Sequence, residues 1–116
     1  MIKGVHTMFY SSQEVQLREF IRDKLKLPAT DVGGGWLIFD LPEADMGCHP
    51  ANPEDGKPSG THYVSFYCDD IEATVLELRE NGVEFLEEIS DVGYGLATHF
   101  EMPGGVPVEL YQPAYK

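Results

Sequence analysis

The chain has 116 residues, of which 42% are hydrophobic and 24% charged, a composition typical of one folded domain rather than of a disordered segment. With 8 Lys and Arg against 20 Asp and Glu, the formal net charge is −12, so the surface repels nucleic-acid phosphates and anionic membranes. No apolar run approaches the ~20 residues that span a bilayer, and the first residues lack a signal-peptide core. We therefore expect a cytoplasmic protein with reduced cysteines and no membrane or nucleic-acid partner.

A strand and a helix are predicted at the start of the chain. β-branched and aromatic residues favour a strand over residues 2–10. The sequence from Ser11 to Glu14 matches a capping box, in which a serine accepts from an early helical N–H and a glutamate reaches back. Pro28 predicts that the helix ends before it, because the residue preceding a proline avoids the helical region. Apolar residues between them recur at helical spacing: Val15, Leu17, Phe20, Ile21 and Leu25.

Two further strands and a linker complete the first half. Residues 36–41 follow a run of three glycines and form a strongly apolar segment, which predicts a strand. A turn at Pro42 and Glu43 leads to a second predicted strand at residues 44–49. Residues 50–60 contain three prolines and two glycines without periodicity, so they are interpreted as a linker.

The second half repeats this order of elements. A strand is predicted at residues 61–68, and a helix then begins at a cap formed by Asp69 or Asp70. Asn81 and Gly82 predict the end of that helix, since glycine enters the left-handed conformation without penalty. Its buried face comprises Ile71, Val75, Leu76 and Leu78, and the three predicted strands that follow are residues 83–89, 96–102 and 106–111.

The two halves also share residues at an offset of 56. Gly4 and His6 coincide with Gly60 and His62, so a glycine and a histidine stand at the entry to a strand in each half. This repeat predicts an α+β fold in which two tandem βαβββ modules form a curved mixed sheet around a cleft. We expect a single domain over residues 1–116, with module 1 at about 1–50, a linker at 51–60 and module 2 at about 61–116.

Side chains suited to a metal ion stand at matching places in the two modules. His6 and His62 open equivalent strands, and Glu109 lies on the final predicted strand. Two imidazoles and a carboxylate suit Fe, Mn, Ni or Zn in the divalent state. A fourth ligand depends on the alignment of the two halves: matching Gly35 with Gly95 gives His49, which we favour, matching the strand ends gives Met46, and a slip of one residue gives Asp45. No fourth ligand is a further alternative.

Taken together, these residues resemble the vicinal-oxygen-chelate superfamily, which includes glyoxalase I, extradiol dioxygenases and bleomycin-resistance proteins. The resemblance covers essentially the whole chain and is most specific in the second half, at Thr61-His62-Tyr63-Val64, Asn81-Gly82-Val83 and Val108-Glu109-Leu110. It implies a divalent metal held by His6, His49, His62 and Glu109, with Glu109 also the catalytic carboxylate. The chain departs from the family at Met102-Pro103-Gly104-Gly105, where many members carry an acidic turn.

Two functions are compatible with this resemblance. One is a metal-dependent lyase, isomerase or ring-cleaving dioxygenase that acts on a small substrate with vicinal oxygens. The other is a metal-free protein that binds or sequesters a small molecule, as bleomycin-resistance proteins do, and the acidic surface suits a cationic drug. Because the predicted modules have open edge strands and small cores, a homodimer is expected in either case.

Overall fold

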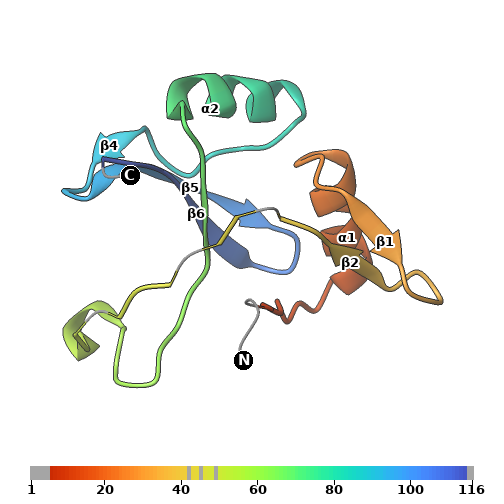
Figure 1. The fold of residues 1–116 in the computed structure, drawn as a ribbon, viewed down its shortest axis with the longest axis horizontal. Coiled ribbons are helices and arrows are strands. Elements are labelled where there is room, and N and C mark those ends of the chain that lie inside the picture. The colour runs from red at the N-terminus through yellow and green to blue at the C-terminus, as the bar shows by residue number, and fades with distance from the viewer. Residues whose placement is uncertain (1–5, 42, 45, 49, 115–116) are drawn as a thin grey trace.

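The structure is a computed structural model in which residues 6–41, 43–44, 46–48 and 50–114 are described. Two helices, six strands and a short 3-10 helix follow one another along the described chain (Figure 1). Their bounds are α1 Glu14–Asp23, β1 Ala29–Asp31, β2 Leu37–Phe39, η1 Pro53–Asp55, β3 Ser65–Tyr67, α2 Ile71–Glu80, β4 Ser90–Asp91, β5 Gly95–Met102 and β6 Val106–Pro113. The expected α+β class, with two βαβββ-like modules and a mixed sheet, is confirmed.

The second module forms a four-stranded sheet in the order β3-β6-β5-β4. β3 runs parallel to β6, whereas β5 is antiparallel to both of its neighbours, β6 and β4. The longest pairing joins β5 to β6 over eight residue pairs, from Gly95 opposite Pro113 to Met102 opposite Val106. A parallel pair needs a crossover, and α2 supplies it between β3 and the antiparallel strands.

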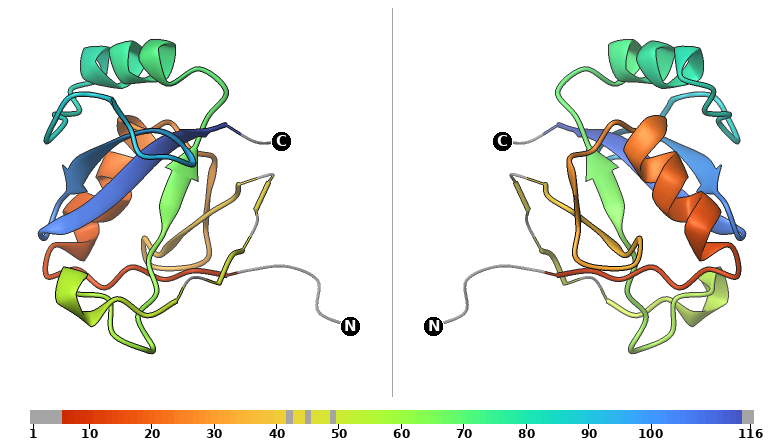
Figure 2. Two further views of the ribbon diagram at one scale, coloured as in Figure 1. Left: turned by 90° about the vertical axis from the view of Figure 1, so that its left-hand side faces the viewer. Right: turned by 90° about the vertical axis from the view of Figure 1, so that its right-hand side faces the viewer.

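Alternation along β5 and β6 gives this sheet two different faces. Thr98, Phe100 and Val108 are buried on the face that α2 covers. His99 and Glu109 are opposite each other in the register, and Ser65 pairs with Glu109 from β3, so these three share the other face. Two views show α2 on one side of the sheet and the segment around η1 on the opposite side (Figures 1 and 2).

The core combines the second module with the helix of the first. Leu17 and Ile21 of α1 are buried in the same cluster as residues of α2, β5 and β6, and the Phe20 ring stacks on Phe100 at 6.2 Å. The cluster comprises Leu17, Ile21, Ile71, Val75, Leu78, Val83, Phe100, Met102, Val108 and Leu110. Burial of these apolar side chains is the main favourable contribution to folding. Neither helix in the described residues is long and apolar enough to cross a membrane.

Polar contacts fix α1 against the second module. The Ser11 hydroxyl donates to the Pro103 carbonyl at 2.8 Å, and the Asn81 side-chain amide donates to the Lys24 carbonyl at 2.9 Å. Gly104 has φ +94°, and a Cβ there would lie 1.9 Å from the Ser11 Oγ. The turn between β5 and β6 therefore needs a glycine where the chain entering α1 touches it.

The two helix starts differ. α2 begins as predicted, with the Asp70 carboxylate accepting from the Ala73 amide at 3.1 Å. α1 begins at Glu14, and its N-cap residue, Gln13, makes no side-chain cap bond, so the predicted capping box is wrong. Ser11 accepts instead from the Gln13 amide just before the helix, and its own proton goes to Pro103. A tertiary contact has replaced the local cap.

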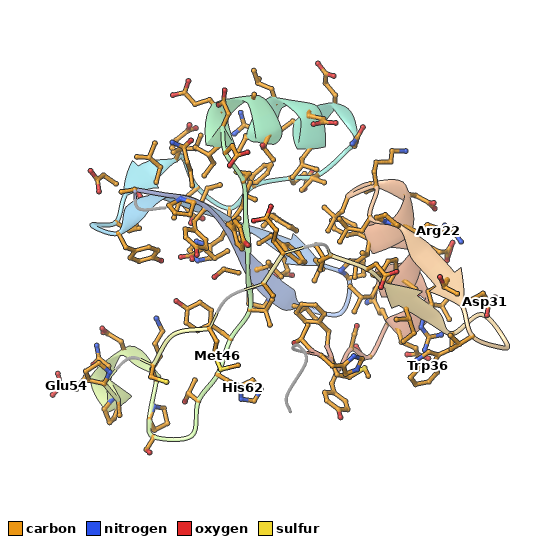
Figure 3. All side chains as sticks on the ribbon, viewed as in Figure 1. Arg22, Asp31, Trp36, Met46, Glu54 and His62 are labelled. Carbon is orange, nitrogen blue, oxygen red and sulfur yellow. The ribbon has the colours of Figure 1, made fainter. Side chains whose placement is uncertain are left out.

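The first module carries fewer strands than the sequence suggested. Residues 6–10 are irregular, as are 44 and 46–48; the remainder of these two predicted strands lies outside the described residues. The segment 36–41 forms only β2, which pairs with β1, a strand that the sequence analysis missed. Asp31 and Trp36 lie beside the turn of this hairpin (Figure 3). β1 follows Pro28, which favours extended backbone.

The predicted strand at 83–89 is also replaced by irregular chain. Phe85 makes an isolated bridge to Phe100, and the Leu86 amide donates to the His99 carbonyl at 2.8 Å. The regular strand comes later, as β4, whose two residues pair with Leu96 and Ala97. Three glutamates in this stretch are exposed, and glutamate has a low propensity for strands, which explains the lack of a continuous hydrogen-bonded strand here: Glu84, Glu87 and Glu88.

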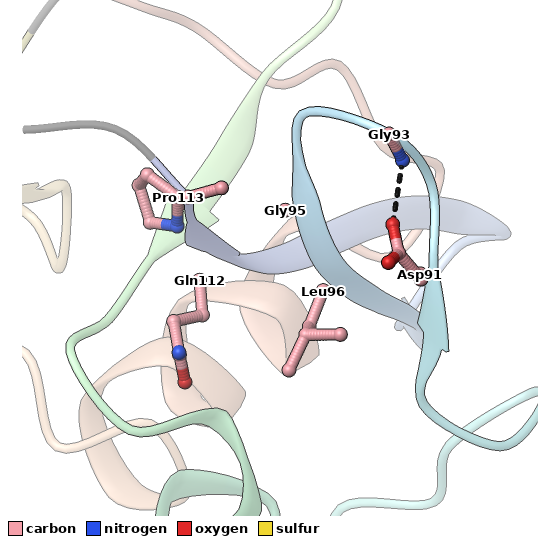
Figure 4. A pocket seen from close by; sticks show the side chains of 7 residues that line it. Asp91, Gly93, Gly95, Leu96, Gln112 and Pro113 are labelled. Carbon is pink, nitrogen blue, oxygen red and sulfur yellow. Dashed lines mark hydrogen bonds between the residues drawn. The ribbon is translucent and has the colours of Figure 1, made fainter.

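The hairpin turns of the two modules have the same construction. The Gly33 amide donates to the Asp31 carboxylate at 2.8 Å. The Gly93 amide donates to the Asp91 carboxylate at the same distance (Figure 4). Each is an Asx turn built on the sequence Asp-Val-Gly. The modules diverge directly afterwards, because Tyr94 of the second turn stands where the first has a glycine. This matched geometry supports duplication of the module.

Candidate functional site

Glu109 is a buried carboxylate in the middle of β6. The residue is 7% exposed, and each of its two oxygens accepts a hydrogen bond from a hydroxyl. The Ser65 Oγ donates to Oε1 at 2.9 Å, and the Tyr94 Oη donates to Oε2 at 2.6 Å. Such bonds compensate an ionised carboxylate for its lost hydration. Glu109 is thus held in one orientation on the sheet face that α2 does not cover.

Strand register and one turn bring these groups together. Ser65 on β3 and His99 on β5 are the residues directly opposite Glu109 on its two neighbouring strands. Tyr94 lies between β4 and β5, and its side chain reaches back to β6. The neighbouring Gly95 is required because a Cβ at that position would lie 2.2 Å from the Gln112 carbonyl oxygen. The close approach of β5 to β6 therefore sets the position of the tyrosine.

A histidine connects Glu109 to a second carboxylate. The His99 Nδ1 lies 2.5 Å from the Glu87 Oε1, and its Nε2 lies 4.0 Å from the Glu109 Oε2. Glu87 and His99 are half-exposed, whereas Glu109 is buried. Polar contacts thus run across this face from Glu87 to His99, from His99 to Glu109 and from Glu109 to Tyr94.

Four tyrosines are linked by contacts beside the carboxylate, and one of them, Tyr94, bonds to it. Tyr111 is buried, and its ring contacts Tyr94 edge-on at 5.6 Å and Tyr67 at 6.0 Å. Tyr63, which is 59% exposed, interacts with the Tyr94 side chain. Large exposed aromatic side chains on one face mark a surface suited to a ligand. We call Tyr63, Tyr67, Tyr94, Tyr111 and Glu109 the tyrosine face.

The environment of Tyr94 keeps its hydroxyl protonated. Partial burial raises the pKa of Tyr94 well above that of an ordinary tyrosine, and the hydrogen bond to Glu109 and that group's negative charge raise it further. Tyr63 adds smaller contributions in the same direction. Tyr94 is therefore a stable donor to Glu109 across the neutral and moderately alkaline range.

Of the other residues predicted as metal ligands, the structure describes His6 and His62. His6 and His62 are exposed on irregular chain, and His62 is labelled in Figure 3. Among the described residues, neither histidine makes a hydrogen bond or ion pair with Glu109, whose partners are Ser65, Tyr94 and His99. His49 and Asp45 lie outside the described residues, and Met46 is 77% exposed. In the part of the chain that is described, no three His, Cys, Asp or Glu side chains lie close enough to hold a metal ion. Among the described residues, the Ser65 and Tyr94 hydroxyls are hydrogen-bonded to the two Glu109 oxygens.

Two hollows lie elsewhere on the described surface. One, of about 140 Å³, is formed by the turn before β5 and the end of β6, around Gly95 and Gln112 (Figure 4). The other, of about 560 Å³, lies beside α1 and the turn between β5 and β6, and is lined by Lys24, Glu84 and Glu101 among others. Neither includes Glu109 or a tyrosine.

Sequence reasoning identified Glu109 and missed most of its partners. Tyr63, Ser65 and Tyr67 alternate along the chain around β3, and Glu109 and Tyr111 alternate along β6. Alternating positions of a strand share one face, so this period of two was the available signal. Tyr94 had no such signal, because a turn residue belongs to no periodic pattern.

Comparison with known proteins places the chain in a family. A sequence model described as Glyoxalase/Bleomycin resistance protein/Dioxygenase superfamily matches residues 9–110. The match spans both modules and includes Ser65, Tyr94, His99 and Glu109. A search of curated proteins found no match.

Solved structures show the same fold. An antibiotic binding protein, TnmS3 from Streptomyces sp. CB03234, has a TM-score of 0.64 and 20% identity, covering 98% of this chain and 100% of its own. A member of the glyoxalase/bleomycin resistance protein/dioxygenase superfamily from Sphaerobacter thermophilus DSM 20745 has a TM-score of 0.63 and 27% identity, covering 97% and 98%. Both likenesses extend over nearly the full length of each chain.

Proposed function

Because the chain belongs to the glyoxalase/bleomycin resistance protein/dioxygenase superfamily, we propose that it binds a small organic molecule on the tyrosine face. The observation that carries this proposal is the buried Glu109, oriented by Ser65 and Tyr94 beside a group of contacting tyrosines. Small-molecule sites combine aromatic surface with a few precisely placed polar groups. The tyrosine face has both features.

Two hydroxyl donors orient Glu109 for contact with a ligand. Each of its oxygens accepts one hydrogen bond and keeps a second lone pair, so the group stays available as a negative charge. The structural likeness to a protein named as antibiotic-binding supports binding over chemistry. The proposed protein therefore holds its ligand through aromatic contact and an oriented negative charge.

Screening with a fragment library tests this proposal. Binders are identified by ligand-observed NMR, and affinities are measured for wild type, Glu109→Gln and Tyr94→Phe. We expect at least one binder whose affinity falls roughly tenfold in Glu109→Gln, because a buried charged partner contributes about 1.5–3 kcal/mol. Glu77→Gln on exposed α2 makes the same change of charge away from the face and should leave affinity unaltered. Equal losses in both glutamine variants would place binding elsewhere.

A divalent-metal enzyme is the second candidate. Membership of a superfamily named after glyoxalases and dioxygenases supports it, as does the position of Glu109 on the last strand. The proposed ligands are His6, His62 and Glu109 with His49, or with Asp45 as the alternative fourth ligand, and Glu109 would also be the catalytic carboxylate. Bound Fe, Mn, Ni or Zn would supply Lewis-acid chemistry.

Metal titration separates the two candidates. Zn(II), Mn(II), Ni(II) and Fe(II) are titrated into wild type, His62→Ala and Glu109→Ala, with His49→Ala and Asp45→Ala run alongside. Loss of affinity in both of the first two variants would support the metal enzyme. Equal affinity in wild type and both variants would leave the binding protein as the function.

A homodimer in the cytoplasm completes the proposal. Several large apolar side chains of the first module are exposed, among them Tyr10 at 90%, Val32 at 63% and Trp36 at 49%. Exposed apolar surface of this extent is typical of an interface. The two cysteines are free, as suits a reducing compartment. A monomer mass from light scattering at micromolar concentration would refute the dimer.

A further inference from the structure

A lysine of the chain itself lies on the tyrosine face. The Lys57 Nζ is 5.0 Å from the centroid of the Tyr63 ring, within the range of a cation–π contact. Among the described residues, it is the one cation placed over a tyrosine ring; the other such contacts involve Trp36, Phe20 and Phe85. An ammonium group is therefore already compatible with this surface.

The loop that carries Lys57 is fixed in place, whereas its side chain is exposed. The backbone of Lys57 pairs with Asn52, with N–O distances of 2.7 and 2.9 Å, and η1 closes the turn between them. Because the backbone is held, the Lys57 ammonium has a high effective concentration at the Tyr63 ring. Rotation of the exposed Lys57 side chain is enough to move the ammonium away from that ring.

The tyrosine face has the electrostatics that an ammonium ion requires. Tyr94 donates its hydroxyl proton to Glu109 at 2.6 Å, which makes the Tyr94 ring richer in electrons and strengthens its attraction for a cation. Glu109 lies at the hydroxyl edge of that ring, and Glu43 Oε1 lies 3.5 Å from the Tyr67 hydroxyl. The net charge of −12 adds a long-range attraction for cations.

Building on the proposed function, we infer that the bound molecule carries an ammonium group, which lies against Tyr63 and Tyr94 with Glu109 as its counter-charge. Lys57 occupies part of this position in the free protein and competes with the ligand. The class of ligand is thus an alkylammonium compound with enough apolar surface to contact the tyrosine rings. Its binding displaces the Lys57 ammonium into solvent.

Choline and its uncharged carbon isostere, 3,3-dimethylbutan-1-ol, test the inference as matched probes. Affinities are measured by NMR titration of the full chain with each probe. We expect choline to bind roughly tenfold more tightly than the isostere, since a partly desolvated cation–π contact contributes about 1–2 kcal/mol. Tyr63→Leu, a change at an exposed residue that leaves the core intact, should abolish most of this difference, and so should Glu109→Gln.

Lys57→Gln tests the competition, with Lys26→Gln as its control. Both variants remove one positive charge from an exposed residue, so long-range attraction changes equally. We expect Lys57→Gln to bind choline several-fold more tightly than Lys26→Gln does. Equal affinities would overturn the role of Lys57, and equal binding of choline and its isostere would overturn the ammonium class. Fragments that bind this face without regard to charge would leave the proposed function standing, whereas no fragment binding there would refute both.

Discussion

The two modules share a turn and an element order but differ in how completely they are built. The second has a four-stranded sheet, a capped helix and a buried core, with Phe100 fully buried. The first contributes a two-stranded hairpin in the described residues, and its helix packs into the core of the second. Val32 and Trp36, at the turn of that hairpin, are exposed. A duplicated unit can thus support one well-formed sheet while the other half contributes a helix to its core.

The largest expected difference in stability between the halves comes from truncating one phenylalanine side chain in each. Phe100 is fully buried between α1, α2 and Phe85, whereas Phe39 on β2 is only partly buried against the same core. We expect Phe100→Ala to lower the free energy of unfolding by about 3–5 kcal/mol, and Phe39→Ala by about 1–2 kcal/mol. Urea unfolding of both variants measures the difference. Equal losses would mean that the halves are equally well packed.

The helix caps provide a smaller comparison. The Asp70 carboxylate accepts from the Ala73 amide at the start of α2, whereas Gln13 makes no cap bond at the start of α1. Asp70→Ala should therefore cost about 1 kcal/mol of unfolding free energy, and Gln13→Ala should cost less than about 0.5 kcal/mol. Thermal unfolding at one protein concentration resolves the two. A larger cost for Gln13→Ala would show that α1 is capped in solution.

Tyr94 should affect stability mainly at high pH. Its pKa is raised in the folded protein, so the folded state retains a proton that the unfolded state loses at about pH 10. The stabilisation is fully present below that pH and is lost as pH rises through the folded-state pKa. Wild type should therefore lose stability between pH 10 and 12 more steeply than Tyr94→Phe. Parallel pH profiles of the two proteins would contradict the bond to Glu109.

The sequence predicted the helix and the long strands of the second module better than it predicted the first module or the contacts of the candidate site. Helical spacing and the cap at Asp69 or Asp70 predicted α2, and the strands expected at 96–102 and 106–111 match β5 and β6 within two residues, because local signals and final packing agree there. Ser11 also matched a local cap, yet its hydroxyl bonds to Pro103, 92 residues away. Glu109 was found by its place on the last strand. Ser65 and Tyr94 were missed, since their contact with it depends on register and on a turn.

The smallest comparison concerns the matched Asx turns. Asp31 and Asp91 each accept from the glycine amide two residues later, at the same 2.8 Å. Asp31→Ala and Asp91→Ala should therefore lower the free energy of unfolding by similar amounts, about 0.5–1.5 kcal/mol each. Urea unfolding of the pair, with the exposed Asp40→Ala as a reference, measures this. A cost confined to Asp91 would show that the first turn is not formed in solution.

The most direct test of the proposed binding face is to map where a bound molecule acts on the chain. Backbone and side-chain NMR shifts are recorded while the tightest fragment from the screen is titrated into wild-type protein. We expect the largest shifts at Tyr63, Ser65, Tyr94, His99 and Glu109, all on one face of the second module's sheet. Shifts centred on the hairpin of β1 and β2, or on the hollow beside Lys24 and Glu101, would contradict the assignment of the tyrosine face as the ligand site.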